Sequence, residues 1–362
     1  MRLLITTDTV GGVWRFALEL TQGLLAEGDA VALASFGRRA LASQREECTQ
    51  LRAEWGDLFE YSEHDIPLEW MQKNERCLIE GAPVLLQVAR TFGAELLHSN
   101  QFCYGAVEIG IPKVVSAHSD VLSWARACRG SLPEPSAWLE RYCDLVAKGL
   151  RSADAVTAPT AWMLDELDKS FPVRPEGTVV PNGRTIVAPP ARERRLQAAT
   201  VGRLWDEAKD VALLTNIKSP IPIVVAGDTE CDGRQLIPAL RISFLGVLSE
   251  REVLRLFAKS AVYVCTSKYE PFGLAPLEAA LCGCAIVARD ILSLREVWGD
   301  AALWFNTAEE LSALLKWLSE DRDSLCKAQQ RASQQARQFS RERMVESYRA
   351  IYTAAKETAC VA

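Results

Sequence analysis

The sequence lacks the features that mark membrane proteins, nucleic-acid-binding proteins and disulfide-rich proteins. Its amino-terminal stretch, MRLLITTDTVGG, has only a short apolar run, so we expect neither a signal peptide nor a membrane span there. No dense basic run is interleaved with aromatic residues, and the formal net charge of −6 gives no support to a nucleic-acid partner. The 11 cysteines form no CxxC pair, and Cys282 and Cys284 are expected to be small buried thiols rather than metal ligands. A reducing, cytoplasmic location fits this cysteine usage.

Histidine is scarce as well, with 3 in 362 residues. His118 directly follows VVSA, at the carboxyl end of a predicted strand. Ligands of open parallel sheets bind at that end of the strands, so we interpret His118 as a site residue. We expect His64 to lie in a surface loop, and His98, inside LLHSN, to be a hydrogen-bonded core group.

The third glycine of a dinucleotide-binding fingerprint is also missing. An apolar stretch at residues 3–7 precedes a turn at 8–12 and an amphipathic helix at 13–26, but the turn contains only Gly11 and Gly12. A nicotinamide enzyme is therefore not expected. Two adjacent glycines fit either a tight turn with a positive φ or close approach of the backbone to a ligand, and the sequence leaves both open.

Short apolar segments alternate with helical patterns along nearly the whole chain, which predicts an α/β fold with parallel sheets covered on both faces. A chain of 362 residues is too long for one hydrophobic core, so we predict two doubly wound, Rossmann-like domains. The predicted strands are at residues 3–7, 30–35, 96–99, 113–117, 155–158, 199–204, 222–227, 242–246, 261–267, 284–288 and 301–305.

The alternation weakens once, between Phe171 and Gln197. The stretch VVPNGRTIVAPPARERRLQ carries an Asn-Gly turn, a Pro pair and a charge cluster, which are typical of a linker. Near the end of the chain, Met344, Tyr348 and Tyr352 form one stripe of a predicted helix that should pack against another surface. We predict an amino-terminal domain at residues 1–181, a linker at 182–198, a carboxy-terminal domain at 199–340, and a final helix at 341–362 that packs back on the amino-terminal domain.

The stretch AVYVCTSKYEPFGLAPLEAALCGCAIVARD, residues 261–290, has the pattern of one βαβ unit. Glu270 lies in its turn and Glu278 on its helix, predicted at residues 274–281. Eight residues correspond to roughly 12 Å of helix rise, so the two carboxylates could contact two parts of one extended ligand but could not share a proton. Gly273 would permit close backbone approach at the helix N-terminus, where free N–H groups point outward.

Two cations are expected at the same edge of the carboxy-terminal sheet. Arg203 closes the strand ATVGRL, and Lys209 lies in the turn or first residues of a helix predicted at 205–216. If the strands are neighbours, both cations enter the crevice that contains Glu270. Arg forks across two oxygens and Lys supplies a compact charge, which is what a diphosphate requires. The DxD at Asp321 and Asp323 lies in a charge-rich helical stretch, and we interpret it as surface.

These residues resemble a known family. YEPFGLAPLEA, with Glu270 and Glu278, resembles the Glu-x7-Glu signature of the family-4 retaining glycosyltransferases, the GT-B relatives of glycogen and sucrose synthases. VGRL with Arg203 and Lys209 resembles the diphosphate-binding pair of this family, and VVPNG, VVSAH and TTDTVGG resemble its hinge, its active-site histidine strand and its glycine loop. The resemblance follows the order of the family's motifs and implies the GT-B fold, two Rossmann-like domains facing across a deep cleft.

The resemblance also implies a role for each matching residue in a transfer from a nucleotide-diphosphate sugar to a hydroxyl acceptor. The implied catalytic residues are Glu270, His118, Arg203 and Lys209. The implied donor contacts are Arg203 and Lys209 to the diphosphate, Glu278 to the ribose, Glu270 and His118 to the sugar, the backbone of Phe272, Gly273 and Leu274 to sugar and phosphate, and Gly12 to phosphate or acceptor. No metal and no cofactor are expected if the two cations stabilise the leaving charge, and the family implies retention at the anomeric carbon.

Two positions depart from the family pattern. Lys209 lies one residue later than in the commonest form of the motif, and Arg184 follows Asn182 and Gly183 where the family often has an apolar residue and then Asp. Three other functions stay open: a nucleotide-sugar epimerase, a phosphorylase, for which we find no pyridoxal-phosphate motif, and a non-catalytic sugar- or nucleotide-binding protein. The donor base, the sugar, the acceptor and the oligomeric state are not predicted, and a transient contact with a membrane surface stays open.

Overall fold

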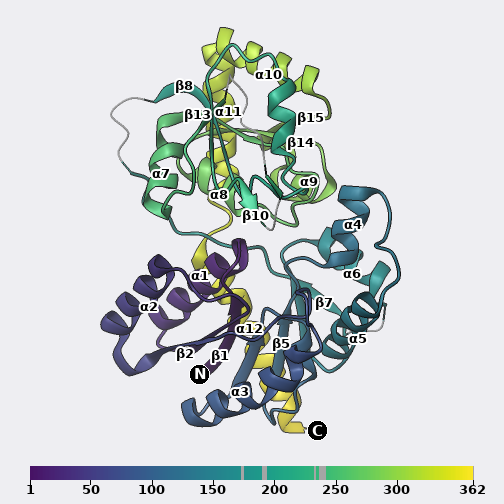
Figure 1. Ribbon diagram of the computed structural model, residues 1–362. Helices are drawn as coiled ribbons and strands as arrows, with labels where there is room; N and C mark the ends of the chain where they lie inside the picture. The colour runs from purple at the N-terminus through teal and green to yellow at the C-terminus, as the bar shows by residue number, and fades with distance from the viewer. Residues whose placement is uncertain (173–174, 190–193, 232–233, 236–241, 362) are drawn as a thin grey trace. The chain divides into compact units, whose positions relative to one another are not determined.

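The computed structural model describes residues 1–172, 175–189, 194–231, 234–235 and 242–361, and residues 190–193 of the predicted linker lie outside this part of the chain. The chain divides into two compact α/β units (Figure 1). The first contains Met1–Arg126, Ser131–Gly183 and the stretch that begins at Arg341. The second contains Ala127–Gly130 and Arg184–Ser340. No helix of the described residues is long and apolar enough to cross a membrane.

The first unit is built on a seven-stranded parallel sheet with the order β3-β2-β1-β4-β5-β6-β7. Side chains alternate between its two faces, so that Leu3 and Ile5 join one hydrophobic cluster and Leu4 joins the other. Both faces are covered, as expected for a parallel sheet. The strands are β1 (Arg2–Asp8), β2 (Ala30–Phe36), β3 (Phe59–His64), β4 (Leu96–Ser99), β5 (Lys113–Ser116), β6 (Ala155–Ala158) and β7 (Gly177–Val179).

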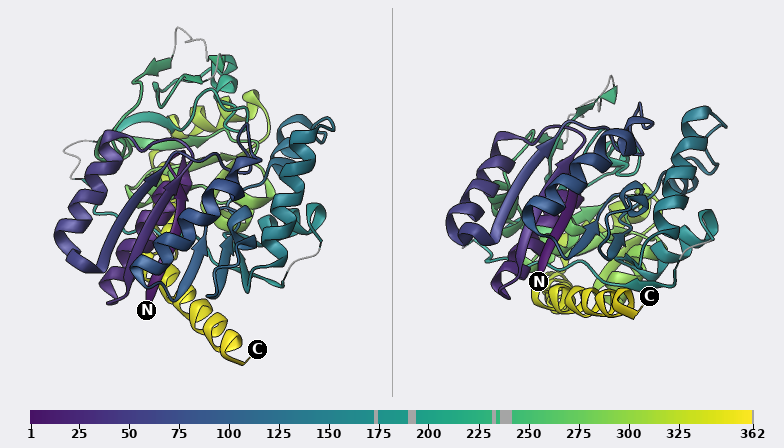
Figure 2. Two further views of the ribbon diagram at one scale, coloured as in Figure 1. Left: turned by 60° about the horizontal axis from the view of Figure 1, so that its bottom comes forward. Right: turned by 90° about the horizontal axis from the view of Figure 1, so that it is seen from below.

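Helices of the first unit follow the strands, and the last helix of the chain joins them. A Cβ atom at Gly23 of α1 would lie 2.4 Å from Val345 Cγ2 of α12, which shows how closely the two helices pack. Arg341 of α12 also contacts Glu19 of α1, with 2.6 Å between Nε and Oε2. Figure 2 shows α12 in yellow. The helices are α1 (Gly12–Ala26), α2 (Ala42–Trp55), α3 (Arg76–Phe92), α4 (Val121–Arg129), α5 (Ala137–Arg151), α6 (Ala161–Ser170) and α12 (Arg341–Val361), with 3-10 turns η1 (Gly56–Leu58) and η2 (Cys103–Ala106).

Buried polar groups tie α12 to the centre of the first sheet. The His98 side chain is fully buried, and its ring nitrogens lie 2.5 Å from Tyr352 Oη and 2.8 Å from Ser116 Oγ. Tyr348 Oη lies 3.1 Å from the same Ser116 Oγ. The prediction that His98 is a hydrogen-bonded core group is confirmed: one partner, Ser116, lies on the neighbouring strand β5, and the other, Tyr352, lies on α12, 254 residues away in sequence.

Stability should therefore depend on pH through His98. Burial lowers the pKa of His98 to about 3, below its usual 6.5, so the unfolded chain binds more protons between these values. The part of the free energy of unfolding that depends on a neutral His98 is fully present above pH 6.5. It falls by about 2 kcal/mol as the pH drops to 5. We expect the free energy of unfolding of His98→Gln, measured with urea at pH 7 and pH 5, to fall less than that of the wild type. Equal pH dependence in the two proteins would contradict a neutral, buried His98.

The second unit is built on a six-stranded parallel sheet with the order β12-β9-β8-β13-β14-β15. Val262 and Val264 pack in one hydrophobic cluster, while Tyr263 and Cys265 pack in the other, so this sheet is also covered on both faces. The strands are β8 (Arg195–Val201), β9 (Ile223–Ala226), β12 (Ile242–Phe244), β13 (Ser260–Cys265), β14 (Ala285–Arg289) and β15 (Ala302–Phe305). A separate antiparallel pair is formed by β10 (Glu230–Cys231) and β11 (Arg234–Gln235).

The βαβ unit predicted at residues 261–290 is present as β13, α8 and β14, and the helix has the predicted bounds. Ser249 caps α7 and forms a capping box with Glu252, which fixes the start of that helix. The remaining elements are η3 (Val211–Asn216), α7 (Glu250–Lys259), α8 (Leu274–Leu281), α9 (Leu292–Trp298), η4 (Gly299–Ala301), α10 (Ala308–Glu320) and α11 (Arg322–Ala336).

Some local predictions are wrong. His64 does not lie in a loop but ends β3, an edge strand that was not predicted because its sequence, FEYSEH, is mostly polar. The other edge strand, β7, is only 3 residues long and was also not predicted. The helix predicted at residues 205–216 is reduced to η3, because Asp210 adopts a left-handed conformation with φ of 44° and interrupts it. Strand β8 begins at Arg195, earlier than the predicted residue 199.

Candidate functional site

The carboxyl edge of the second sheet brings together the residues that the sequence singled out there. Strands β8 and β13 are neighbours, so the loops that follow them meet at the same edge of the sheet. The loop after β8 contains Arg203 and Lys209, and the loop after β13 contains Glu270. Two hydrogen bonds connect these loops: Lys268 N–H donates to Ala208 O at 2.8 Å, and Thr266 Oγ1 donates to Lys209 O at 2.6 Å.

Lys209 and Glu270 form an ion pair across these two loops. Their side chains are 22% and 15% exposed, so the pair is partly buried but still accessible to solvent. Glu270 is held further by Ser267 Oγ, which lies 3.3 Å from its Oε2, and by Ser293 Oγ, which donates to its backbone carbonyl at 2.7 Å. The position of Lys209, one residue later than in the common motif, therefore leaves its ammonium in direct contact with Glu270.

Arg203 points its guanidinium toward its own loop. Its Nη2 lies 2.7 Å from Asp206 Oδ2, and its Cζ lies 5.6 Å from the centre of the Trp205 ring. The side chain is 40% exposed, whereas that of Asp206 is 7% exposed. A cation this exposed can rotate toward a bound anion at small cost, because an exposed ion pair contributes little to stability.

Helix α8 begins directly beside Glu270. Gly273 precedes the helix in the left-handed conformation, with φ of 93°, and no side chain caps the helix there. A Cβ at Gly273 would lie 2.9 Å from Pro276 Cγ and 3.3 Å from Glu270 Cγ, so only glycine leaves room for both. Backbone N–H groups at the N-terminus of a helix, which in α8 starts at Leu274, favour anions in general. Phe272 is 2% exposed and packs edge-to-face on Phe339 with ring centres 5.4 Å apart.

Glu278, on α8, is held by a residue that sequence reasoning did not assign to the site. Its Oε1 lies 3.1 Å from Arg184 Nε, and Arg184 Nη2 lies 2.6 Å from Glu250 Oε1. The side chain of Arg184 is 1% exposed. The available signal in the sequence was the departure of Arg184 from the family pattern after Asn182 and Gly183.

The carboxyl edge of the first sheet carries the other predicted site residues. Gly11 has φ of 75° and precedes α1, so the tight-turn interpretation of the glycine pair is confirmed for Gly11. Gly12 is the first residue of α1 and is exposed. Asp8 Oδ1 accepts the N–H of Val10 at 2.8 Å and closes the turn. The first turn of α1 contains no acidic residue, and its N-cap residue Gly11 makes no side-chain cap hydrogen bond.

His118 follows β5 at the same edge and is held in one tautomer. Its Nε2 lies 2.7 Å from Asn100 Oδ1, while Asn100 Nδ2 donates to Thr6 O at 2.7 Å. Because the amide nitrogen faces a carbonyl, the amide oxygen faces His118 and the imidazole proton resides on Nε2. Burial lowers the pKa of His118 to about 4, and the Phe16 ring lies 4.4 Å away, so the imidazole is neutral near pH 7.

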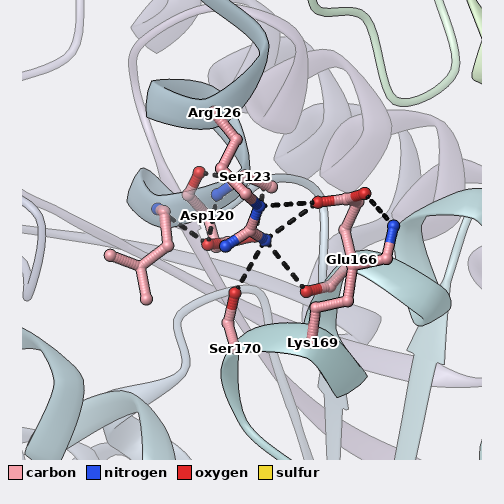
Figure 3. A network of polar contacts seen from close by, with 7 residues as sticks. Asp120, Ser123, Arg126, Glu166, Lys169 and Ser170 are labelled. Carbon is pink, nitrogen blue, oxygen red and sulfur yellow. Dashed lines mark hydrogen bonds and ion pairs between the residues drawn. The ribbon is translucent and has the colours of Figure 1, made fainter. Parts of the chain in front are cut away.

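A polar network fixes α4, which begins three residues after His118, to α6 (Figure 3). Asp120 Oδ1 accepts the N–H groups of Leu122 and Ser123 at 2.8 and 3.0 Å. Farther along α4, Arg126 Nη2 lies 2.8 Å from Glu166 Oε2 on α6. Burial alone would raise the pKa of Glu166, but hydrogen bonds from Lys169 and Arg126 lower it below the usual range. The network therefore holds the chain that follows His118 in place.

The acidic residues and cysteines that the sequence did not assign to a functional site have structural roles. Asp321 caps α11, since its Oδ1 accepts the Ser324 N–H at 2.9 Å. Cys282 and Cys284 are buried, and burial raises the pKa of their thiols to about 11 and about 12. Among the described residues, no group of three or more His, Cys, Asp or Glu side chains could hold a metal ion.

Two family models together match nearly the whole chain. "Glycosyltransferase Family 4" matches residues 10–186, and "Glycosyl transferases group 1" matches residues 193–339. Each model therefore covers most of one structural unit.

Curated relatives match parts of the chain. α-Maltose-1-phosphate synthase of Mycolicibacterium smegmatis is 28% identical over 251 residues, which cover 57% of this chain and 62% of the relative. Glycogen synthase of Mycobacterium tuberculosis is 32% identical over 180 residues, which cover 44% of each protein. The chain thus spans about three fifths or less of the length of these relatives.

Solved structures match the fold over nearly the full length. Sucrose-phosphate synthase of Thermosynechococcus elongatus has a TM-score of 0.72 at 17% identity, with 98% of this chain and 100% of that chain covered. Anabaena HepE in complex with UDP-glucose has a TM-score of 0.70 at 17% identity, with the same coverage. The two family models show that the chain belongs to the family-4 glycosyltransferases, and the solved structures show that it has the GT-B fold.

Proposed function

We propose that this protein is a retaining glycosyltransferase that moves a sugar from a nucleoside-diphosphate sugar to a hydroxyl acceptor without a metal ion. The observation that carries the proposal is the ion pair of Lys209 with Glu270, close to the N-terminus of α8, with Arg203 in the same loop as Lys209. A cation, a hydroxyl-binding carboxylate and a helix N-terminus at one sheet edge suit the two ends of a sugar diphosphate.

In the proposed reaction the bond between the anomeric carbon and the diphosphate oxygen breaks, and a bond to the acceptor oxygen forms on the same face of the sugar. Lys209 and Arg203 would stabilise the negative charge that develops on the leaving diphosphate, and the acceptor proton would pass to that diphosphate. Glu270, now paired with Lys209, would accept hydrogen bonds from sugar hydroxyls, and Glu278 would accept those of the ribose. His118 would contact the sugar as a neutral hydrogen-bonding group.

Ligand binding gives the direct test of the proposed donor site. We expect one of UDP-glucose, ADP-glucose and GDP-mannose to raise the melting temperature, because a ligand at 100 times its Kd adds about 2.7 kcal/mol of stability. Inorganic pyrophosphate should give a smaller shift through the cations alone. UDP-glucose heads the panel because it is the ligand in the related Anabaena structure. A chain that no sugar nucleotide stabilises would contradict the proposal.

The reaction itself separates the proposal from its rivals. With the stabilising donor and a panel of hydroxyl acceptors, we expect acceptor-dependent release of nucleoside diphosphate that persists in EDTA. Loss of activity in EDTA would contradict the metal-free mechanism. Conversion of the donor to an epimer without release of the diphosphate would instead identify an epimerase, and a thermal shift without turnover would identify a binding protein.

A further inference from the structure

Arg184 is the most deeply buried cation in contact with a proposed donor residue in the described part of the chain. Its side chain is 1% exposed, and it lies between the carboxylates of Glu250 and Glu278, at 2.6 and 3.1 Å. A guanidinium removed from water in this way is stable only if carboxylates compensate its charge. The two glutamates therefore hold Arg184, and Arg184 in turn holds them.

We propose that Arg184 is a positioning residue that orients the Glu278 carboxylate for the ribose of the nucleotide. This inference rests on the proposed function, in which Glu278 accepts hydrogen bonds from the ribose hydroxyls. Carboxylates accept hydrogen bonds from hydroxyl groups most strongly when they are ionised and fixed in direction. The contact of the Arg184 guanidinium with Glu278 Oε1 fixes the direction of that carboxylate.

The two glutamates depend on Arg184 to different degrees. Glu250 is 33% exposed and is the first residue of α7, where solvent and the helix N-terminus also stabilise a negative charge. Glu278 is 13% exposed and lies within α8, away from the N-terminus of that helix. Removal of Arg184 should therefore affect the orientation of Glu278 more than that of Glu250.

The backbone of Arg184 is fixed by the same packing that holds the turn of Glu270 and Phe272. Its N–H donates to Phe339 O at 3.0 Å, and the Phe339 ring packs on Phe272, two residues after Glu270. Arg184 thus reaches Glu278 from a main chain that is anchored next to the loop of Glu270. The planar guanidinium of an Arg side chain loses little conformational entropy for each hydrogen bond that it forms.

Binding of three probes tests the positioning role. The probes are the nucleoside diphosphate among UDP, ADP and GDP that binds the wild type, its 2′,3′-dideoxy analogue, and inorganic pyrophosphate, each titrated by calorimetry. We expect the wild type to prefer the ribonucleotide over the dideoxy analogue by roughly tenfold or more, as hydrogen bonds to a charged group predict. In Arg184→Met this preference should shrink to about twofold or less, while the Kd for pyrophosphate changes by less than about twofold.

Glu250→Gln is the matched control, since it removes the other carboxylate partner and should keep the ribose preference of the wild type. If Arg184→Met does not fold, Arg184→Lys is used instead, and its point charge should leave an intermediate ribose preference. An undiminished ribose preference in the Arg184 variant would overturn the inference, as would an equal loss of affinity for all three probes, which indicates a merely structural role. Absence of binding of all three probes to the wild type would contradict the proposed function itself.

Discussion

Lys209→Ala should lower kcat for sugar transfer by about 10² to 10³, as removal of a group that stabilises a developing negative charge typically does. Lys209 is the cation that the structure places against Glu270, at the edge where β8 and β13 end. In the variant the proposed diphosphate site would lose one of its two cations, and Glu270, 15% exposed, would lose its ion-pair partner. The measurement is steady-state transfer with the donor identified by thermal shift, with kcat and KM determined separately.

Lys268→Ala provides the control for this variant. Lys268 lies in the loop after β13, two residues before Glu270, but its Nζ lies 3.4 Å from Asp210 Oδ1 and its side chain is 39% exposed. A surface ion pair of this kind contributes about 1 kcal/mol or less, so we expect kcat within about threefold of the wild type. Circular dichroism at the assay temperature establishes that both variants are folded. Equal kcat values for Lys209→Ala and the wild type would show that Lys209 does not stabilise the leaving group.

The regular parts of both units could be predicted from the sequence because buried parallel strands and amphipathic helices leave a local pattern. The helix at Leu274–Leu281 has the predicted bounds, because its apolar residues recur at intervals of three and four residues and Gly283 ends the helical pattern. The sequence did not predict that β8 and β13 are neighbours, because strand order is set by packing; the meeting of the cations with Glu270 was predicted only if they are. That order is what brings Lys209 to Glu270.

The rest could not be predicted because it depends on contacts between distant residues. Arg184 lies 94 residues before Glu278, and no periodicity encodes a buried guanidinium, which sequence statistics place at the surface. Likewise, the pairing of Arg203 with Asp206 follows from the turn that replaced the predicted helix. Local propensity favoured a helix there, and the left-handed Asp210 prevented it.

Gly227→Ala should unfold or strongly destabilise the second unit and abolish donor binding with it. Gly227 follows β9 with φ of 141°, a conformation that side-chain-bearing residues rarely adopt, and a Cβ there would lie 1.7 Å from Gly202 O. Two backbones meet at this point, so neither can rotate away as a side chain would. Strain and overpacking together should cost roughly 3 kcal/mol or more, or about 10 °C in Tm.

The same clash would reach the site, because Gly202 directly precedes Arg203 and its N–H donates to Ala226 O at 3.1 Å. A displacement of about 1 Å at a positioned catalytic group can cost as much as 10² in rate. Gly246→Ala is the control that measures the effect of backbone strain without a clash. Gly246 has φ of 69°, but nothing lies within 4 Å of a Cβ added there. We expect Gly246→Ala to lose only about 1 kcal/mol and to keep the thermal shift with donor. Similar melting temperatures for the two variants would show that the backbone contact of Gly227 with Gly202 does not hold the loop of Arg203 in place.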